Sequence, residues 1–220
     1  MLEQLSLLSF ASGGWGSALL AGSLVTIALA LSCLPIGLPL GLLVAVAARS
    51  KSRWMRAWAT TFSTVFRGLP ELLTLLIIYY GCQIAAQKIL EAMGYDVQFT
   101  INTFVAAMIA FSLVFAAFSS EIWLGAFKTI PKGQYEAASA LGLPGLSNNW
   151  LSLLKDTSLV STIALVDLMR QTNLAVSVTK DPMLFYTVAC FIYLFFSAIS
   201  GRLFAFMERY FNRHIRSVQP

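Results

Sequence analysis

Charged residues are scarce in this chain of 220 residues. Only 11% are Asp, Glu, Lys or Arg, whereas 58% are hydrophobic, and the mean hydropathy is +0.75. A soluble domain carries roughly 25% charged residues and 45–50% apolar ones, so the composition excludes an ordinary soluble domain. The apolar runs are continuous and do not alternate with polar residues, which favours an all-α, polytopic membrane protein over a barrel of strands.

Motifs that carry covalent chemistry are also missing. The chain has one histidine, His214, in a basic tail, and three cysteines scattered through apolar segments without the spacing of metal ligands. It contains no Gly-x-Ser-x-Gly and no Gly-x-x-x-x-Gly-Lys-Ser/Thr loop, so neither a hydrolase nor a nucleotide-binding ATPase is predicted. We therefore expect no enzyme, no metal site and no cofactor in this chain.

Five long apolar stretches predict five transmembrane helices in a single domain, 1–220. They cover about 17–48, 69–87, 104–127, 150–177 and 183–207. Prolines and glycines between Pro35 and Gly41 predict a kink in the first helix, and Gly68-Leu69-Pro70 predicts a break before the second.

The distribution of charge predicts how these helices are oriented. Basic residues without acidic ones follow the first stretch, and Arg209, Arg213 and Arg216 make the end after the last stretch basic, whereas residues 88–100 carry a net charge of minus one. The excess of Lys and Arg on one side marks the cytoplasmic loops, so we expect an N-out, C-in topology. Charge of this kind, placed beside apolar stretches, explains the net charge of +5 better than nucleic-acid binding does. The basic residues of the first loop alternate with aromatic or apolar ones, which indicates an interfacial helix. The basic residues are Arg49, Lys51, Arg53 and Arg56, and the others are Trp54, Met55 and Trp58.

Among the ionisable residues in or beside the predicted helices, five are candidates for a role in a polar path: Arg67, Glu71, Glu121, Asp167 and Arg170. A charge at the centre of a membrane helix costs about 2.5–3.5 kcal/mol on insertion scales. Asp167 and Arg170 are three residues apart on the fourth predicted helix and are spaced to pair, as are Arg67 and Glu71 four residues apart. Two interpretations remain open: local ion pairs that specify helix packing, or side chains that line a polar path for a charged or zwitterionic solute.

A polar gap between the third and fourth stretches holds a short helical motif, Glu136-Ala137-Ala138, followed by Gly142. The preceding Pro131-Lys132-Gly133 predicts a helix start, so a helix over about 132–143 is expected, ended by Pro144-Gly145. Ser147-Asn148-Asn149 then predicts the N-cap of the fourth transmembrane helix.

Several motifs together resemble those of ABC importer permeases for polar amino acids. Glu136-Ala137-Ala138-x-x-x-Gly142 resembles the cytoplasmic EAA motif of that family, and Arg67-Gly68-Leu69-Pro70 is similar to its Arg-Gly-Thr-Pro element. Ser120-Glu121-Ile122 resembles its Ala-Glu-Ile, and residues 154–161 resemble its Leu-Lys-Asp-Thr-Ser-Leu stretch. Four ordered matches over most of residues 17–207 identify the chain as a member of this family.

The resemblance implies a type I importer fold and a multi-pass location in the bacterial inner membrane, in contact with membrane lipid. It implies a second permease subunit, identical or paralogous, an ATPase dimer that binds the ATP, and a periplasmic solute-binding protein. Polar or basic amino acids, or related solutes, would be transported. Glu136 would offer a carboxylate to the ATPase, Ala137 and Ala138 would allow close approach, and Gly142 would permit the turn.

One stretch departs from the family pattern. The pattern continues past the glycine to an Ile-x-Leu-Pro element, whereas Leu143-Pro144 follows Gly142 directly in this chain and the expected positions read Ser152-Leu153-Leu154-Lys155. The second half of the coupling element is therefore expected to be shortened or absent. Two alternatives to a permease are an ion-gradient-driven transporter that uses Glu121 or Asp167 as a proton relay, and a membrane scaffold that transports nothing.

Overall fold

The computed structural model describes residues 6–11, 13–95, 98–129 and 135–216, in which the regular elements are helices and no strand occurs. The elements that matter below are α2 (Gly16–Ala48), α3 (Arg53–Gly68), α4 (Glu71–Ala92), α5 (Thr103–Thr129), α6 (Tyr135–Asp156), the 3-10 helix η1 (Thr157–Ile163), α7 (Leu168–Thr179) and α8 (Pro182–Arg216). Four segments among the described residues are long and apolar enough to cross a membrane: α2, α4, Thr103–Phe127 of α5 and Pro182–Tyr210 of α8.

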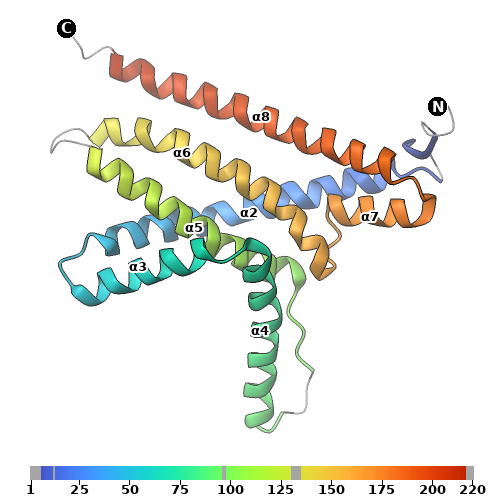
Figure 1. The fold of residues 1–220 in the computed structure, drawn as a ribbon, viewed down its shortest axis with the longest axis horizontal. Helices are drawn as coiled ribbons and strands as arrows, with labels where there is room; N and C mark the ends of the chain where they lie inside the picture. Colours follow the sequence, from blue (N-terminus) through green and yellow to red (C-terminus); the bar gives the residue numbers. More distant parts are fainter. Residues whose placement is uncertain (1–5, 12, 96–97, 130–134, 217–220) are drawn as a thin grey trace.

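The long helices α2, α5, α6 and α8 run side by side along the longest axis of the molecule (Figure 1). Helix α3 packs beside α2 and α5, whereas α4 lies across the direction of the others and projects from the bundle (Figure 1). The end of α2, the start of α3, the end of α5, the start of α6 and the end of α8 all lie at the same end of the bundle (Figure 1). The main core forms where α2, α4, α5, α6 and η1 meet, around Leu29, Phe111 and Leu154.

Helix α2 continues through both of its prolines, and its glycines serve close packing against α5. A Cβ atom on Gly37 would lie 2.8 Å from Cδ1 of Phe115, and one on Gly41 would lie 2.8 Å from Cβ of Ser119 and 2.9 Å from the Ala116 carbonyl oxygen. Small residues four apart let two membrane helices approach closely, which strengthens their van der Waals contact.

We expect Gly41→Ala to destabilise the protein. The added methyl group would overlap backbone and Cβ atoms of α5, and overpacking of this kind costs about 1–3 kcal/mol, more than the gain in helix propensity of up to about 1 kcal/mol. Gly81→Ala in α4 is the matched control, because nothing lies within 4 Å of its Cβ position. The measurement is the thermal unfolding midpoint in detergent; an equal midpoint for both variants would contradict the packing argument.

The predicted break before the second transmembrane stretch is confirmed. Helix α3 ends at Gly68, Leu69 and Pro70 are extended with ψ of 141° and 137°, and α4 starts at Glu71. Proline disfavours helical geometry in the residue before it and lacks the N–H that a helix needs. The break redirects the chain, so α4 leaves the bundle.

The fourth predicted helix, 150–177, is wrong as a single element. Helix α6 ends at Asp156, η1 follows, Ala164 is left-handed with φ of 60°, and α7 starts only at Leu168. Thr157, Ser161 and Thr162 each donate a side-chain hydrogen bond to the carbonyl three residues earlier, at 2.7–3.0 Å. Such bonds compete with the helical backbone pattern, and hydropathy alone does not register them.

Two predictions about the polar gap are also wrong. The helix that carries Glu136 does not stop at Pro144-Gly145, and Asn148-Asn149 does not start a new helix, because α6 is continuous from Tyr135 to Asp156. Gly145 serves packing within the continuous helix: a Cβ on this residue would lie 2.8 Å from Cγ2 of Ile122 in α5, so the glycine permits a close contact between the helices. Residues 130–134, where the 132–143 helix was expected to begin, lie outside the described residues.

Candidate functional site

A cavity of about 410 Å³ lies where α3 and α4 meet α5 and α6. Charged and polar side chains line much of it, together with phenylalanines of α5. The polar lining consists of Arg67, Glu71, Glu121, Asn148, Asn149, Ser152 and Asp156. The structure therefore brings together three of the five ionisable residues that the sequence singled out, and adds Asp156 to them.

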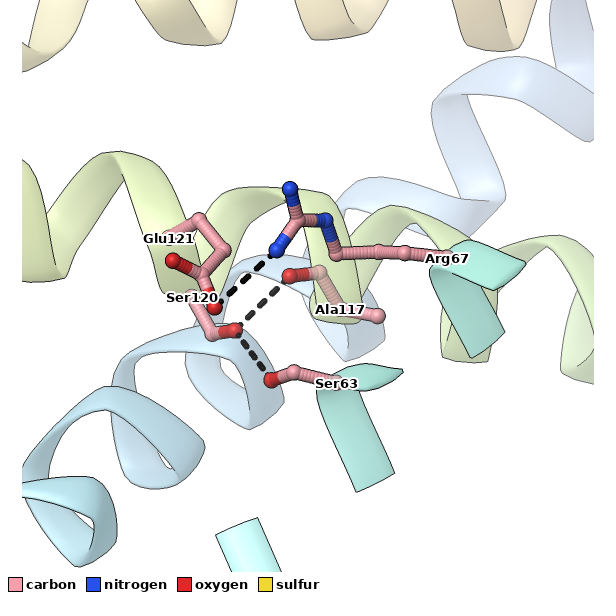
Figure 2. A network of polar contacts seen from close by, with 5 residues as sticks. All are labelled: Ser63, Arg67, Ala117, Ser120 and Glu121. Carbon is pink, nitrogen blue, oxygen red and sulfur yellow. Dashed lines mark hydrogen bonds and ion pairs between the residues drawn. The ribbon is translucent and has the colours of Figure 1, made fainter. Parts of the chain in front are cut away.

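Arg67 and Glu121 form an ion pair at this cavity. Nη1 of Arg67 lies 3.1 Å from Oε1 of Glu121, with side chains 42% and 43% exposed, and Figure 2 shows the two side chains reaching toward each other from α3 and α5. The Arg67 guanidinium also lies 5.7 Å from the centre of the Phe118 ring. Arg67 thus makes its ion pair with α5, because the break at Leu69-Pro70 separates it from Glu71.

A pair of buried serines holds α3 in register with α5. Oγ of Ser63 and Oγ of Ser120 are 2.9 Å apart, and Ser120 donates to the Ala117 carbonyl at 2.7 Å (Figure 2). Since Ser120 donates elsewhere, Ser63 is the donor in the bond between the two hydroxyls. Arg67 lies one turn beyond Ser63 and Glu121 directly follows Ser120, so the serine contact places the ion pair.

Asn149 joins the opposite wall of the cavity to α5. Its side chain is 8% exposed, and Nδ2 donates to the Phe115 carbonyl at 3.2 Å and to Oγ of Ser119 at 2.9 Å. Asn149, Ser152 and Asp156 follow one another at spacings of three and four residues, and all three line the cavity. One face of α6 is therefore polar where it meets α5, and this spacing is the sequence signal that identifies Asn149 and Asp156.

The charges of the cavity are unequal. Glu71, Glu121 and Asp156 supply three carboxylates against the single guanidinium of Arg67. Among the described residues no group of His, Cys, Asp or Glu has the arrangement of a metal site. Carboxylates with amides and a hydroxyl nearby can receive an ammonium or guanidinium group, and Arg67 can receive a carboxylate.

Asp167 and Arg170 lie away from this cavity. Asp167 is fully buried at the N-cap of α7, where its carboxylate accepts hydrogen bonds from the backbone N–H groups of Arg170 at 2.9 Å and Met169 at 3.2 Å. The carboxylate thus satisfies the free N–H groups at the start of α7. Its backbone also packs on α2, because a Cβ on Gly22 would lie 2.7 Å from the Asp167 carbonyl oxygen.

The residues of the EAA-like motif lie on the first half of α6. Helix α6 starts at Tyr135, so Glu136, Ala137, Ala138 and Gly142 share one helix with the cavity residues Asn149 and Asp156. The side chains of residues 128–143 lie outside the described part of the structure. The backbone nevertheless connects the motif to the cavity without an intervening loop.

Comparisons with known proteins give consistent results. A profile of the family "Binding-protein-dependent transport system inner membrane component" matches residues 37–147. The histidine/lysine/arginine/ornithine transport system permease protein HisQ of Escherichia coli (strain K12) is 35% identical, over 90% of this chain and 95% of that protein. The octopine transport system permease protein OccQ of Rhizobium meliloti is 34% identical, over 96% of this chain and 98% of that protein. A crystal structure of an amino acid ABC transporter with histidines superposes with a TM-score of 0.76 and 25% identity, covering 89% of this chain and 94% of that one.

The relatives have residues that this chain does not have. The alignment with HisQ is 218 positions long but uses only 90% of the 220 residues here, so about twenty positions of the relative have no counterpart in this chain. The alignment with OccQ, 231 positions over 96% of this chain, shows a difference of the same size.

Proposed function

Since this chain belongs to the inner membrane components of binding-protein-dependent transport systems and is a permease subunit of a polar amino acid ABC importer, we propose that the cavity between α3, α4, α5 and α6 is part of its solute pathway. The observation that carries the proposal is the set of charged groups in a cavity of about 410 Å³: the Arg67–Glu121 pair with Glu71 and Asp156. Charged groups are costly in a membrane unless they pair or face a water-filled space.

The roles of the permease and ATPase subunits follow from the family. A permease subunit carries the solute, and ATP is hydrolysed in a partner ATPase, so this chain is not an enzyme. A solute-binding protein delivers the solute to importers of this kind. We also propose a second permease subunit, identical or paralogous, since several helices keep apolar faces exposed in the single chain, including Ile77 and Ile84 of α4.

The proposed solutes are basic amino acids or related cations. Three carboxylates and one guanidinium line the cavity, so a solute with one carboxylate and two cationic groups would balance its charges better than an acidic amino acid would. The named relatives are permeases for histidine, lysine, arginine and ornithine, and for octopine, which agrees with this proposal.

We propose the N-out, C-in orientation for the bundle. The basic loop after α2 lies at the same end as the start of α6 and the end of α8 (Figure 1), and an excess of Lys and Arg marks the cytoplasmic side. That end would face the ATPase in the cytoplasm of a bacterium. Glu136, Ala137, Ala138 and Gly142 would then contact the ATPase, and α6 would transmit its movement to the cavity.

Asp156→Asn should lower uptake of arginine about tenfold, the change in rate that corresponds to about 1.4 kcal/mol, because the cavity loses a carboxylate that faces the cation. Uptake is measured in proteoliposomes that hold the permease pair and its ATPase, with one binding protein throughout, so that selection by the binding protein is constant. Glu91→Gln, an exposed carboxylate on α4 away from the cavity, is the control. Equal uptake by Asp156→Asn and the control would remove Asp156 from the pathway.

Asp167 and Arg170 remain predicted pathway residues, and the same assay decides their role. Asp167→Asn and Arg170→Gln change charge with little change of shape. Unchanged uptake and solute range in both variants would leave Asp167 with its role as the cap of α7 alone.

A further inference from the structure

An exposed cluster of cations and aromatic rings lies where α2 ends and α3 begins. We call it the basic–aromatic patch; it consists of Arg49, Lys51, Arg53, Trp54, Met55, Arg56 and Trp58. Every one of these residues is exposed, and Trp54 is 87% exposed. So large an exposed fraction is unusual for a tryptophan side chain, which is mostly buried in folded proteins. The solute pathway uses none of these residues.

The apolar surface of α2 leads directly into the patch. Leu43 and Val46, in the last two turns of α2, are 64% and 55% exposed, and α2 is a candidate membrane span that ends at Ala48. The first cation follows at the next residue. Exposed aliphatic side chains on a spanning helix face acyl chains, so the cations start where the hydrocarbon ends, at the depth of the lipid headgroups.

The chemistry of the patch fits an anionic headgroup. No acidic residue occurs between Arg49 and Pro70, so nothing within this stretch neutralises the cations. Trp58 stacks on Phe62 at 5.7 Å and Phe62 contacts Phe66 at 4.8 Å, which fixes one aromatic side of α3. Tryptophan favours the headgroup region, and clustered Lys and Arg beside it attract anionic lipids.

We propose that the basic–aromatic patch binds anionic phospholipid of the leaflet that it faces, with Arg53 and Arg56 at the phosphate and Trp54 and Trp58 among the headgroups. A protein partner is the other possible occupant of an exposed patch. The lipid is favoured because the patch continues the lipid-facing surface of α2 without interruption and because its charge is of one sign.

The test is quenching of tryptophan emission by brominated lipid. The full chain is reconstituted in phosphatidylcholine vesicles to which brominated phosphatidylglycerol or brominated phosphatidylcholine is added. The anionic lipid should quench more strongly. Arg53→Gln/Arg56→Gln should lower the relative affinity for the anionic lipid by about fivefold for each charge removed, equivalent to about 1 kcal/mol each. Lys88→Gln/Lys180→Gln removes the same charge from exposed positions elsewhere and should leave the preference unchanged.

Three results would overturn the proposal. The first is equal quenching by the two lipids in the native chain. The second is a preference that survives in Arg53→Gln/Arg56→Gln, or quenching that is unchanged in Trp54→Phe/Trp58→Phe, since the lipid would then bind elsewhere. The third is loss of co-purification with the ATPase in the arginine variant while the lipid preference stays, which would make the patch a protein-binding surface.

Discussion

Arg67→Glu should reduce solute uptake by about a hundredfold, which corresponds to about 2.7 kcal/mol in the rate. The variant replaces the single guanidinium that lines the cavity, so that four carboxylates line it instead, at positions 67, 71, 121 and 156. Carboxylates that line the same cavity repel one another. The cavity also loses the group that receives the carboxylate of an amino acid.

The double variant Arg67→Glu/Glu121→Arg exchanges the two charges of the ion pair. It shows whether the loss of uptake comes from breaking the ion pair or from changing the net charge of the cavity. It restores one cation opposite one anion across the same 3.1 Å contact, and we expect it to recover a substantial part of the uptake. Because both side chains are more than 40% exposed, their pairing contributes little to stability, in the range of exposed salt bridges. Thermal unfolding midpoints should therefore stay close to that of the native protein while uptake changes.

The control for this pair is Arg202→Glu, which makes the same charge change at an exposed position of α8. It should leave uptake near the native rate. Native uptake in Arg67→Glu would show that the ion pair lies outside the pathway, and a double exchange no better than Arg67→Glu would show that each charge is required at its own position.

Leu143→Pro should uncouple transport from ATP hydrolysis, with loss of uptake of at least about tenfold. Residue 143 lies in the interior of α6, between the Glu136 motif and the cavity residues Asn149 and Asp156. A proline in a helix interior costs about 3 kcal/mol, and here it would precede Pro144, so the helix would break between the Glu136 motif and the cavity residues. Movement of the ATPase at one end would then no longer shift the other.

Leu143→Ala is the matched variant, because it removes the same side chain and keeps the helix. It should couple normally, and Pro144→Ala should do so too. The readouts are uptake and the stimulation of ATP hydrolysis by the loaded binding protein, with co-purification of the ATPase as the test of assembly. Normal coupling in an assembled Leu143→Pro complex would mean that the continuity of α6 is unimportant for transmission.

Helix α6 carries both the EAA-like motif and part of the cavity wall. Relatives have about twenty residues without counterpart here, and in this chain the motif and the cavity wall share one helix of 22 residues. A helix rises 1.5 Å per residue, so the motif and Asp156 are separated by about 30 Å of continuous helix. A continuous helix of this length would transmit both rotation and translation from the motif to the cavity.

The fold class, the break before α4 and the family could be predicted from local sequence. Scarce charge and continuous apolar runs predicted a helical membrane protein, since a backbone in lipid must satisfy its own hydrogen bonds. Gly68-Leu69-Pro70 predicted the break before α4 because proline restricts its own geometry and that of its neighbour. The order of four short motifs indicated the permease family, and the motif residues Arg67 and Glu121 were singled out because charge in a membrane helix is costly.

Tertiary structure decided the rest. Gly145 lets α6 pack closely on Ile122 of α5, and the start of α7 is held on α2, where the Leu168 N–H donates to Oγ1 of Thr26 at 3.2 Å. The partner of Arg67 is 54 residues away in sequence, brought there by the contact between Ser63 and Ser120. Composition and hydropathy determined that these helices form in a membrane, because those quantities depend on each residue alone. Which charges share a cavity depended on how the helices pack, because that packing joins residues far apart in the chain.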